Sequence, residues 1–407
     1  MARFTLPRDI YHGKGSLEIL KTFRGERAMI CVGGGSMKRF GFLDRAEQYL
    51  KEAGFTVEVF EGIEPDPSVE TVMRGADAML AFQPDWIIAI GGGSPIDAAK
   101  AMWIKYEYPE ITFPEMTKVF GLPQLRRKAH FCAVSSTSGT ATEVTAFSII
   151  TNNQERIKYP IADFEITPDV AIVDPELAET MPKKLVAHTG MDAITHAIEA
   201  YVSTANCAYT DPLAIHAIEM IIRDLIPSYE GDMEARDRMH DAQCLAGMAF
   251  SNALLGIVHS MAHKTGPAFD DYGAHIIHGA ANAMYLPKVI AFNAKDETAK
   301  KRYGEIVNYM GICEKSASDE EKVEALIQYL RDMNDKLNIP HCIRHYGADS
   351  YPTEQGFVPE EVFLERLPEI AKNAIADACT LSNPRKISQE EMEKLLKACY
   401  YDTEANF

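Results

Sequence analysis

The chain has 407 residues, of which 46% are hydrophobic and 25% are charged. This length and composition are typical of a globular protein large enough for two domains with substantial cores. The formal net charge of −18 argues against nucleic acid and anionic membrane surfaces as partners.

The cysteines and the N-terminal residues indicate the compartment. The eight cysteines are scattered and include no Cys-x-x-Cys pair, a pattern typical of reduced thiols in a cytosolic protein. The first residues lack the apolar run of a signal peptide, and no stretch has the length of a transmembrane helix. We therefore expect a cytoplasmic protein.

Short apolar and β-branched runs alternate with helical stretches in the first part of the chain. We expect strands at residues 28–32, 55–60, 86–90, 131–134, 148–151 and 170–173, and helices at 40–53, at 68–82 and from 95 onward. This alternation predicts a parallel, doubly wound sheet. We therefore assign residues 1–182 to an α/β domain.

The pattern changes after residues 174–175, and nearly everything from 183 onward has helical periodicity. Asp211 followed by Pro212 predicts a helix N-cap with proline at the first helical position. We therefore expect residues 183–407 to form an all-helical domain.

Five of the twelve histidines fall in short apolar segments of this helical part, together with one aspartate. Asp192 and His196 are four residues apart, a spacing that places both side chains on one face of a helix. His259 and His263 repeat that spacing. The six candidates are Asp192, His196, His259, His263, His275 and His278. One carboxylate with several imidazoles is a ligand set for a divalent transition metal.

A single histidine on an apolar helix face is more often a satisfied core residue than a metal ligand. Burying several imidazoles and a carboxylate together is costly unless something satisfies them, which favours a metal-binding domain at 183–407. Not all six can be ligands, because a catalytic site uses three or four protein groups and keeps a position for substrate.

A glycine-rich turn at residues 91–93 joins a predicted strand to a predicted helix. Glycines let the backbone approach a pyrophosphate, and the helix N-terminus attracts its charge, so Gly92 and Gly93 are candidate cofactor-binding residues. Ser94 is the expected N-cap, and Asp97 lies three residues on, as in a capping box. The turn is not a Gly-x-Gly-x-x-Gly fingerprint, so an ordinary Rossmann assignment would be too strong.

A second glycine turn, at residues 33–35, follows the first predicted strand and continues into Ser36, Lys38 and Arg39. NAD-specific sites usually place an acidic residue near here, whereas a serine and cations suit the 2′-phosphate of NADP. We therefore expect Gly34, Ser36 and Lys38 to bind NADPH, with NADH as the weaker candidate. Hydroxyl donors at 135–140 add Ser136 and Thr137 after another strand.

These segments together resemble the iron-containing, or group III, alcohol dehydrogenases. Residues 174–199 resemble that family's first signature, and 259–263 with 278–283 resemble its second. Residues 91–97 and 136–145 match its cofactor loops. The likeness runs nearly end to end and is nearest to the butanol dehydrogenases of the family that use NADPH.

The resemblance implies a fold, a ligand set and a cofactor. The fold is dehydroquinate synthase-like, an α/β dinucleotide domain followed by an all-α domain. Asp192, His196, His259 and His278 fall on the family's metal-ligand positions, usually filled with Fe²⁺ and sometimes Zn²⁺. His263 matches a histidine that assists proton transfer, while Lys158 and Thr145 match cofactor positions. Homodimers or higher homo-oligomers are also implied.

Two departures from the family pattern affect the site. Residues 270–274 form an insertion of about five residues before His275, and Ile277 stands where proline is usual. We choose His278 over His275 as the ligand because His278 directly precedes Gly279. Leu381 stands where relatives have glycine, close to the C-terminus.

We therefore expect a metal-dependent alcohol dehydrogenase that interconverts short-chain, butanol-like primary alcohols and aldehydes with NADP(H). His263 and His275 are the candidate proton relays, and His263 is preferred because it shares a helix face with His259. The alternatives are an NAD-dependent diol or glycerol dehydrogenase, a lyase-like synthase on the same two-domain frame, a metal-dependent hydrolase and a non-catalytic assembly subunit. No basic cluster for a phosphorylated or carboxylated substrate surrounds the histidines, which counts against the synthase. The glycine loops count against the hydrolase, and the Asp/His set counts against the assembly subunit.

Overall fold

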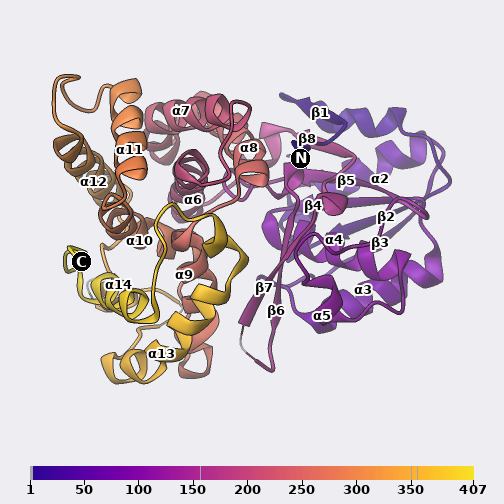
Figure 1. Cartoon of the computed structure of the whole chain (residues 1–407). Coiled ribbons are helices and arrows are strands. Elements are labelled where there is room, and N and C mark those ends of the chain that lie inside the picture. The colour runs from indigo at the N-terminus through magenta and orange to yellow at the C-terminus, as the bar shows by residue number, and fades with distance from the viewer. Residues whose placement is uncertain (1–2, 156, 350, 355) are drawn as a thin grey trace. The chain divides into compact units, whose positions relative to one another are not determined.

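The computed structural model describes residues 3–155, 157–349, 351–354 and 356–407 and divides into two compact units (Figure 1). Unit 1 comprises Met1–Met181 and Met233–Ser251, and unit 2 comprises Pro182–Asp232 and Asn252–Phe407. The sequence predicts a continuous second domain from residue 183, whereas most of α8 (Met233–Ala253) groups with unit 1. Two hydrogen bonds join α8 to other residues of unit 1: Gln243 donates to Glu143 at 2.5 Å, and the Ala146 amide donates to Ser251 Oγ at 2.9 Å.

Unit 1 is built on a six-stranded sheet in which every described pairing is parallel. The strand order is β1-β8-β5-β4-β2-β3. The strands are β1 (Asp9–His12), β2 (Arg27–Val32), β3 (Thr56–Phe60), β4 (Trp86–Gly91), β5 (His130–Ser135) and β8 (Val170–Val173). The predicted parallel sheet is confirmed, and β1 is a short edge strand that the sequence patterns did not reveal.

Helices cover both faces of this sheet, because alternate residues of each strand enter different cores. Ile87 and Ala89 of β4 pack with residues of α3 (Val69–Phe82) and α4 (Gly93–Glu107). Ile88 and Ile90 pack instead with η1 (Ser16–Thr22) and α2 (Phe42–Glu52). The sheet is therefore doubly wound, as predicted.

The strand expected at 148–151 belongs to a separate structure. It is β6 (Phe147–Asn152), which pairs antiparallel with β7 (Ile157–Ala162) instead of joining the parallel sheet. Asn152 Oδ1 accepts the amides of Gln154 and Glu155 and turns the chain back at once. A parallel strand would have needed a longer crossover connection, so the predicted placement was wrong.

The remaining described elements of unit 1 are short. They are α1 (Ser36–Arg39), α5 (Phe113–Met116), η2 (Thr142–Val144), η3 (Phe164–Ile166) and η4 (Pro175–Leu177). Of these, α1 follows the glycine turn after β2, and η2 follows the hydroxyl-rich segment after β5.

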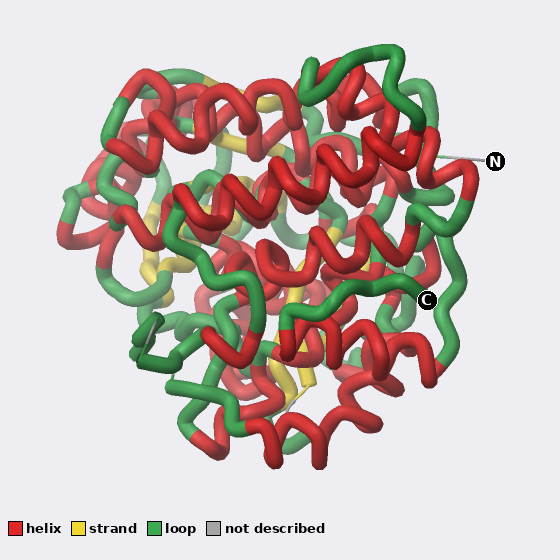
Figure 2. Tube along the Cα trace, turned by 90° about the vertical axis from the view of Figure 1, so that its left-hand side faces the viewer, coloured by secondary structure: helices red, strands yellow, loops and turns green. Residues whose placement is uncertain are grey.

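Unit 2 contains helices and no strand among its described residues (Figure 2, helices in red). Its α-helices are α6 (Lys183–Val202), α7 (Thr210–Glu230), α9 (Ile257–Thr265), α10 (His278–Asn293), α11 (Glu297–Met310), α12 (Asp319–Lys336), α13 (Glu360–Ala376) and α14 (Gln389–Tyr401). Three short 3₁₀ turns join them: η5 (Pro267–Tyr272), η6 (Ile343–His345) and η7 (Ala378–Ser382). The predicted change from α/β to all-helical structure is confirmed.

One predicted helix start in this unit was wrong. Helix α7 begins at Thr210 with Tyr209 as its N-cap, so Asp211 already lies within the first turn and Pro212 is the third helical residue. Asp211 pairs with Arg302 of α11 at 2.8 Å instead of capping the helix. Proline is tolerated there because the first-turn amides have no partner within the helix.

No single helix in the described part of the chain is long and apolar enough to cross a membrane. Helix α8 and the segment Ile257–Tyr272 meet the requirements of length and composition only when taken together as a bent pair.

Candidate active site

The candidate metal ligands are brought together inside unit 2 by three packed helices, α6, α9 and α10. Asp192 and His196 lie one turn apart on α6 and are almost completely buried. Oδ1 of Asp192 is 3.8 Å from Nε2 of His196. The predicted sharing of one helix face is therefore present in the structure.

Two further histidines reach the same carboxylate oxygen from the other helices. His259, in the first turn of α9, places Nε2 3.6 Å from Oδ1 of Asp192. His278, the first residue of α10, places Nε2 3.5 Å from that atom. Three imidazole nitrogens thus surround one buried carboxylate oxygen, and Asp192, His196 and His259 form a geometric cluster suited to a metal ion.

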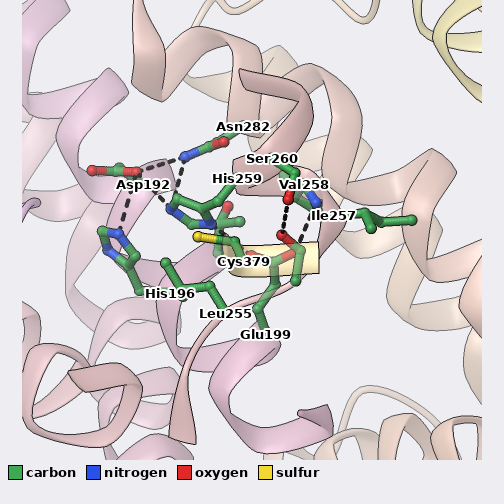
Figure 3. A network of polar contacts seen from close by, with 12 residues as sticks. Asp192, His196, Glu199, Leu255, Ile257, Val258, His259, Ser260, Asn282 and Cys379 are labelled. Atoms are coloured by element: carbon green, nitrogen blue, oxygen red, sulfur yellow. Dashed lines mark hydrogen bonds and ion pairs between the residues drawn. The ribbon is translucent and has the colours of Figure 1, made fainter. Parts of the chain in front are cut away.

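Asn282, one turn after His278 on α10, completes this cluster (Figure 3). Its Nδ2 donates to Oδ1 of Asp192 at 2.7 Å and lies 3.2 Å from Nε2 of both His259 and His278. Apart from this amide, the converging atoms are those that ligate metals when the imidazoles are neutral. One carboxylate and three imidazoles are a suitable set of ligands for Fe²⁺ or Zn²⁺.

The charges in the cluster reinforce one another. Burial alone would raise the pKa of Asp192, but the imidazoles of His196, His278 and His259 hold it well below its usual range. Burial alone would lower the pKa of His259, but the carboxylates of Asp192 and Glu199 raise it to about 9. Asp192 is therefore ionised, and the site attracts positive charge.

A glycine allows α10 to approach α6 closely enough for His278 to reach the cluster. A Cβ atom on Gly279 would lie 2.2 Å from the backbone oxygen of His188 on α6. This contact is far closer than real Cβ atoms make, so only glycine fits without moving a helix. The choice of His278, made from its place before Gly279, is consistent with this packing.

His263 lies beside the cluster on α9 and is itself buried. Its ring stacks on that of His278 with centroids 5.4 Å apart, and its Nδ1 lies 3.2 Å from Oδ2 of Asp377. Burial lowers the pKa of His263, although the Asp377 carboxylate acts in the opposite direction. With Nδ1 facing Asp377, Nε2 is the ring nitrogen that can exchange a proton elsewhere.

A second group of potential ligands comprises His263, Asp377 and Cys379. The Lys264 ammonium already lies 2.9 Å from Oδ2 of Asp377. A lysine ammonium neutralises that carboxylate without a metal, so we interpret this group as a support for His263.

His275, the other proton-relay candidate, makes a different contact. Its Nδ1 lies 2.7 Å from Oδ1 of Asp270, the first residue of the inserted segment 270–274. The side chain of His275 is 27% exposed, and that of Asp270 is 50% exposed. His275 is therefore paired with an exposed carboxylate of the inserted loop, whereas His263 is paired with the buried carboxylate of Asp377.

The predicted cofactor loops gather at the carboxyl edge of the sheet in unit 1. The turns after β2 and β4 flank the point where the strand order reverses, the usual ligand position in a doubly wound sheet. The Ser136 amide donates to the Gly91 carbonyl at 2.8 Å, which joins the loop after β5 to the loop after β4. Gly34 precedes α1, while Ser36 and Lys38 lie on it and are exposed.

The capping prediction for α4 was wrong. The helix starts at Gly93, and its N-cap is Gly92, without a side-chain capping bond. Ser94 Oγ accepts the Asp66 amide at 3.2 Å, and the Asp97 carboxylate accepts the backbone amide of Ile149. Burial raises the pKa of Asp97 to about 7. Gly92, Gly93 and Ser94 nonetheless form the predicted strand-to-helix turn.

The other predicted cofactor residues lie deeper in unit 1. Thr137 and Thr145 belong to the segment between β5 and β6, and Thr145 is buried. Lys158, on β7, places Nζ 2.7 Å from Oδ1 of Asp66. Lys100 of α4, which the sequence patterns did not single out, donates to the carbonyls of Thr142, Thr145 and Phe147 at 2.7–2.9 Å.

Comparisons with known proteins decide the family. The family profile described as "Iron-containing alcohol dehydrogenase" matches residues 7–175, and "Fe-containing alcohol dehydrogenase family, C-terminal" matches residues 186–400. The chain belongs to the iron-containing alcohol dehydrogenase family. Both the predicted resemblance and the predicted fold are confirmed.

Individual relatives of this alcohol dehydrogenase agree over the full length. The NADPH-dependent butanol dehydrogenase of Clostridium saccharobutylicum is 59% identical, with 100% of both chains covered. The iron-containing alcohol dehydrogenase of Thermococcus thioreducens has a TM-score of 0.85 at 36% identity, covering 98% of this chain and 100% of that one. A 1,3-propanediol oxidoreductase has a TM-score of 0.86 at 31% identity, with the same coverage.

Family membership confirms that the protein is an enzyme, an oxidoreductase that acts on alcohols. The hydrolase and assembly-subunit alternatives are therefore set aside. The structure also adds residues that the sequence did not single out as functional: Glu199, Asn282 and Asp377. Glu199 and Asn282 lie inside the segments that resemble the family signatures, but their partners are distant in sequence.

Proposed function

We propose that this alcohol dehydrogenase interconverts short-chain primary alcohols, such as butanol, and their aldehydes with NADP(H) and Fe²⁺. The observation that carries the proposal is the convergence of His196, His259 and His278 on Oδ1 of Asp192 at 3.5–3.8 Å. The name and 59% identity of the Clostridium saccharobutylicum relative support the substrate and cofactor.

The loop after β2 supports NADPH over NADH. It offers Ser36 and the Lys38 ammonium at the start of α1, and Gly34 has open space around it. A 2′-phosphate carries two negative charges that a hydroxyl and an ammonium can bind. Glu61 lies 3.1 Å from the Lys38 ammonium, and it would lose this partner when a phosphate binds.

The metal would be held by Asp192, His196, His259 and His278. When bound, a divalent ion at this position supplies Lewis-acid polarisation of the substrate oxygen, so that hydride exchange between the substrate carbon and nicotinamide becomes easier. Fe²⁺ and Zn²⁺ both suit one carboxylate and three imidazoles, and we propose Fe²⁺ with Zn²⁺ as a substitute.

The protein's own groups orient the site and move the proton. Asp192 supplies the single negative charge among the proposed ligands. A bound divalent cation would therefore keep a net positive charge, which would stabilise an oxyanion of the substrate. His263, held through Nδ1 by Asp377, is the proposed proton carrier through Nε2. His275 is the second candidate, with Asp270 as its partner.

The test is butanal-dependent oxidation of NADPH and of NADH by metal-stripped protein, before and after anaerobic addition of Fe²⁺. We expect turnover that requires Fe²⁺ and prefers NADPH. Turnover that requires Fe²⁺ but prefers NADH would support the proposed reaction and contradict the proposed contact between Lys38 and the 2′-phosphate. No turnover of butanal with either cofactor would contradict the proposed substrate.

An NAD-dependent diol dehydrogenase is the second candidate, favoured by the TM-score of 0.86 with a 1,3-propanediol oxidoreductase. Oxidation of 1,3-propanediol or glycerol with NAD⁺, measured beside butanol with NADP⁺, separates the two activities. The cytoplasmic location and the homodimeric or higher oligomeric state stay predictions.

A further inference from the structure

Both ring nitrogens of His259 lie against buried carboxylates. Nε2 is 3.6 Å from Oδ1 of Asp192, and Nδ1 is 2.6 Å from Oε2 of Glu199 (Figure 3). His259 and Glu199 are 1% and 3% exposed, so water does not compete for the short contact. Glu199 lies on α6, two turns after Asp192.

The contact with Glu199 determines where the lone pair of His259 points. An ionised carboxylate only accepts hydrogen bonds, so Nδ1 must carry the proton that it donates to Glu199. In the neutral ring Nε2 then has its lone pair free and directed at Asp192 and the other imidazoles. A carboxylate behind a ligating histidine fixes both ring orientation and tautomer in this way.

The second oxygen of Glu199 holds the helix that carries His259. Oε1 accepts the backbone amide of Val258 at 2.8 Å, and Oδ1 of Asn383 accepts that of Ile257 at 3.3 Å. Helix α9 begins at Ile257, and its N-cap, Gly256, forms no side-chain capping bond. Glu199 therefore replaces the local cap, and its charge lies at the positive end of the α9 dipole.

Gly256 is required for this arrangement. A Cβ atom there would lie 2.7 Å from Oε1 of Glu199 and 2.9 Å from Oδ1 of Asn383. The absence of a side chain allows both polar groups to reach the first amides of α9. The helix start, its glycine and Glu199 thus form one unit that fixes the backbone of His259.

We propose that Glu199 is the positioning residue for His259: one oxygen fixes the ring and its tautomer, and the other fixes the start of α9. The inference rests on the metal site of the proposed function and adds a residue to it. Glu199 touches neither substrate nor cofactor in this role, and it acts on the metal site through the ring and the backbone of His259.

An isosteric amide cannot replace this carboxylate, so Glu199→Gln is an informative substitution. If the new amide turned its NH₂ toward Nδ1, the ring would have to accept there and carry its proton on Nε2, which removes the lone pair from the metal site. If the amide turned its NH₂ the other way, two donors would meet at the Val258 amide. Both orientations of the amide therefore weaken metal binding through His259.

The test is Co²⁺ binding by the full-length, metal-stripped protein, measured by competition with a chromophoric chelator and by the Co²⁺ absorption spectrum. Glu199→Gln is expected to bind Co²⁺ about 10–100-fold more weakly than wild type and to change the spectrum. When Glu199→Gln is combined with His259→Ala, it is expected to cause no further loss of Co²⁺ affinity, because both oxygens of Glu199 act on the metal site by positioning the His259 ring.

Glu107→Gln is the matched control, because Glu107, like Glu199, is a buried glutamate whose carboxylate accepts backbone amides. Glu107 accepts the amides of Arg127, Lys128 and Ala129 in unit 1 and has no histidine among these partners. Its substitution is expected to lower the melting temperature without changing Co²⁺ affinity. A general loss of stability would thereby be separated from a loss of positioning.

Two failures can be told apart. Absence of Co²⁺ binding by the wild-type protein would overturn the proposed metal site and with it this inference. Unchanged affinity and spectrum in folded Glu199→Gln would overturn the role of Glu199 alone. If Glu199→Gln does not fold, Glu199→Asp keeps the charge but draws the carboxylate back by one methylene group. The same weakening is expected, and unchanged affinity would again overturn the role.

Discussion

Oδ1 of Asp192 lies 3.5 Å from Nε2 of His278, although Asp192 is in the middle of α6 and His278 begins α10. The contact depends on Gly279, because any side chain there would meet the backbone of His188. Asp192 therefore serves as the common neighbour of three histidines from three helices. Single substitutions can distinguish His278, the proposed ligand, from the histidines beside it.

His278→Ala is expected to lose bound metal and alcohol dehydrogenase activity together, because it removes one of four proposed ligands. Metal content by elemental analysis and butanal reduction are the two measurements. His275→Ala is the control for metal content alone and should keep its metal, since His275 is part-exposed and paired with Asp270. A His278→Ala protein with full iron and full turnover would show that the wrong histidine has been chosen.

His263→Ala is expected to keep metal but to lower kcat, by roughly 10²–10⁴-fold if His263 transfers the proton. Its ring lies beside His278 but is held by Asp377. Asp377→Asn is expected to lower kcat less, because the ring remains while its orientation loosens. Loss of metal from His263→Ala at the level of His278→Ala would instead identify His263 as a ligand.

Lys38→Ala is expected to raise KM for NADPH by roughly 10–100-fold, the range for losing one charged hydrogen bond, with little change for NADH. Initial rates with both cofactors measure this ratio. The control is Glu61→Gln, which removes the competing partner 3.1 Å from the ammonium. This variant should bind NADPH as well as wild type or better, and an equal loss for both cofactors in Lys38→Ala would reject a contact with the 2′-phosphate.

His240 of α8 is expected to make unit 1 less stable in acid. It is buried and bonded through Nδ1 to Ser138 Oγ at 3.1 Å, and burial lowers its pKa from 6.5 to about 4. Between pH 6.5 and about 4, His240 binds a proton in the unfolded chain but not in the folded protein. The free energy of unfolding therefore rises with pH in this window, and the contribution of His240 is lost as the pH falls from 6.5 toward 4. The full effect is about 3 kcal/mol.

The measurement is the denaturant midpoint of metal-free wild type and His240→Gln from about pH 7 to about pH 4. Carboxylates titrate in both proteins and largely cancel in the comparison. The wild-type midpoint should fall more steeply than that of His240→Gln across this window. Parallel curves would show that His240 makes no contribution to the pH dependence.

The sequence predicted the parts of the fold that depend on local patterns. The apolar run of β4 is buried on both faces, so its residues alone indicate a central parallel strand. β1 escaped prediction because its three half-buried residues and one exposed residue, at a sheet edge, form no such run. The place of β6 also escaped, since pairing with β7 rather than with the sheet depends on a reversal at Asn152.

The site shows the same division between local and distant information. The spacing of four residues between Asp192 and His196 was enough to predict a shared helix face. The supports could not be predicted in this way. Glu199 meets His259 and Asp377 meets His263 only after α6, α9 and η7 pack together. The capping-box pattern likewise gave a wrong prediction for Asp97, because its carboxylate accepts the Ile149 amide instead of capping α4.

Gly279→Ala is expected to destabilise unit 2 and to weaken metal binding. The new Cβ would lie 2.2 Å from the His188 backbone oxygen, so α10 must move away from α6 and carry His278 with it. Overpacking of this kind costs roughly 1–3 kcal/mol, more than the roughly 1 kcal/mol that alanine gains over glycine within a helix. Melting temperature and Co²⁺ affinity are the measurements.

Gly34→Ala is the control for stability, because no atom lies within 4 Å of its added Cβ, and its melting temperature should not fall. If Gly279→Ala melts and binds Co²⁺ as wild type does, close packing of α10 on α6 does not position His278.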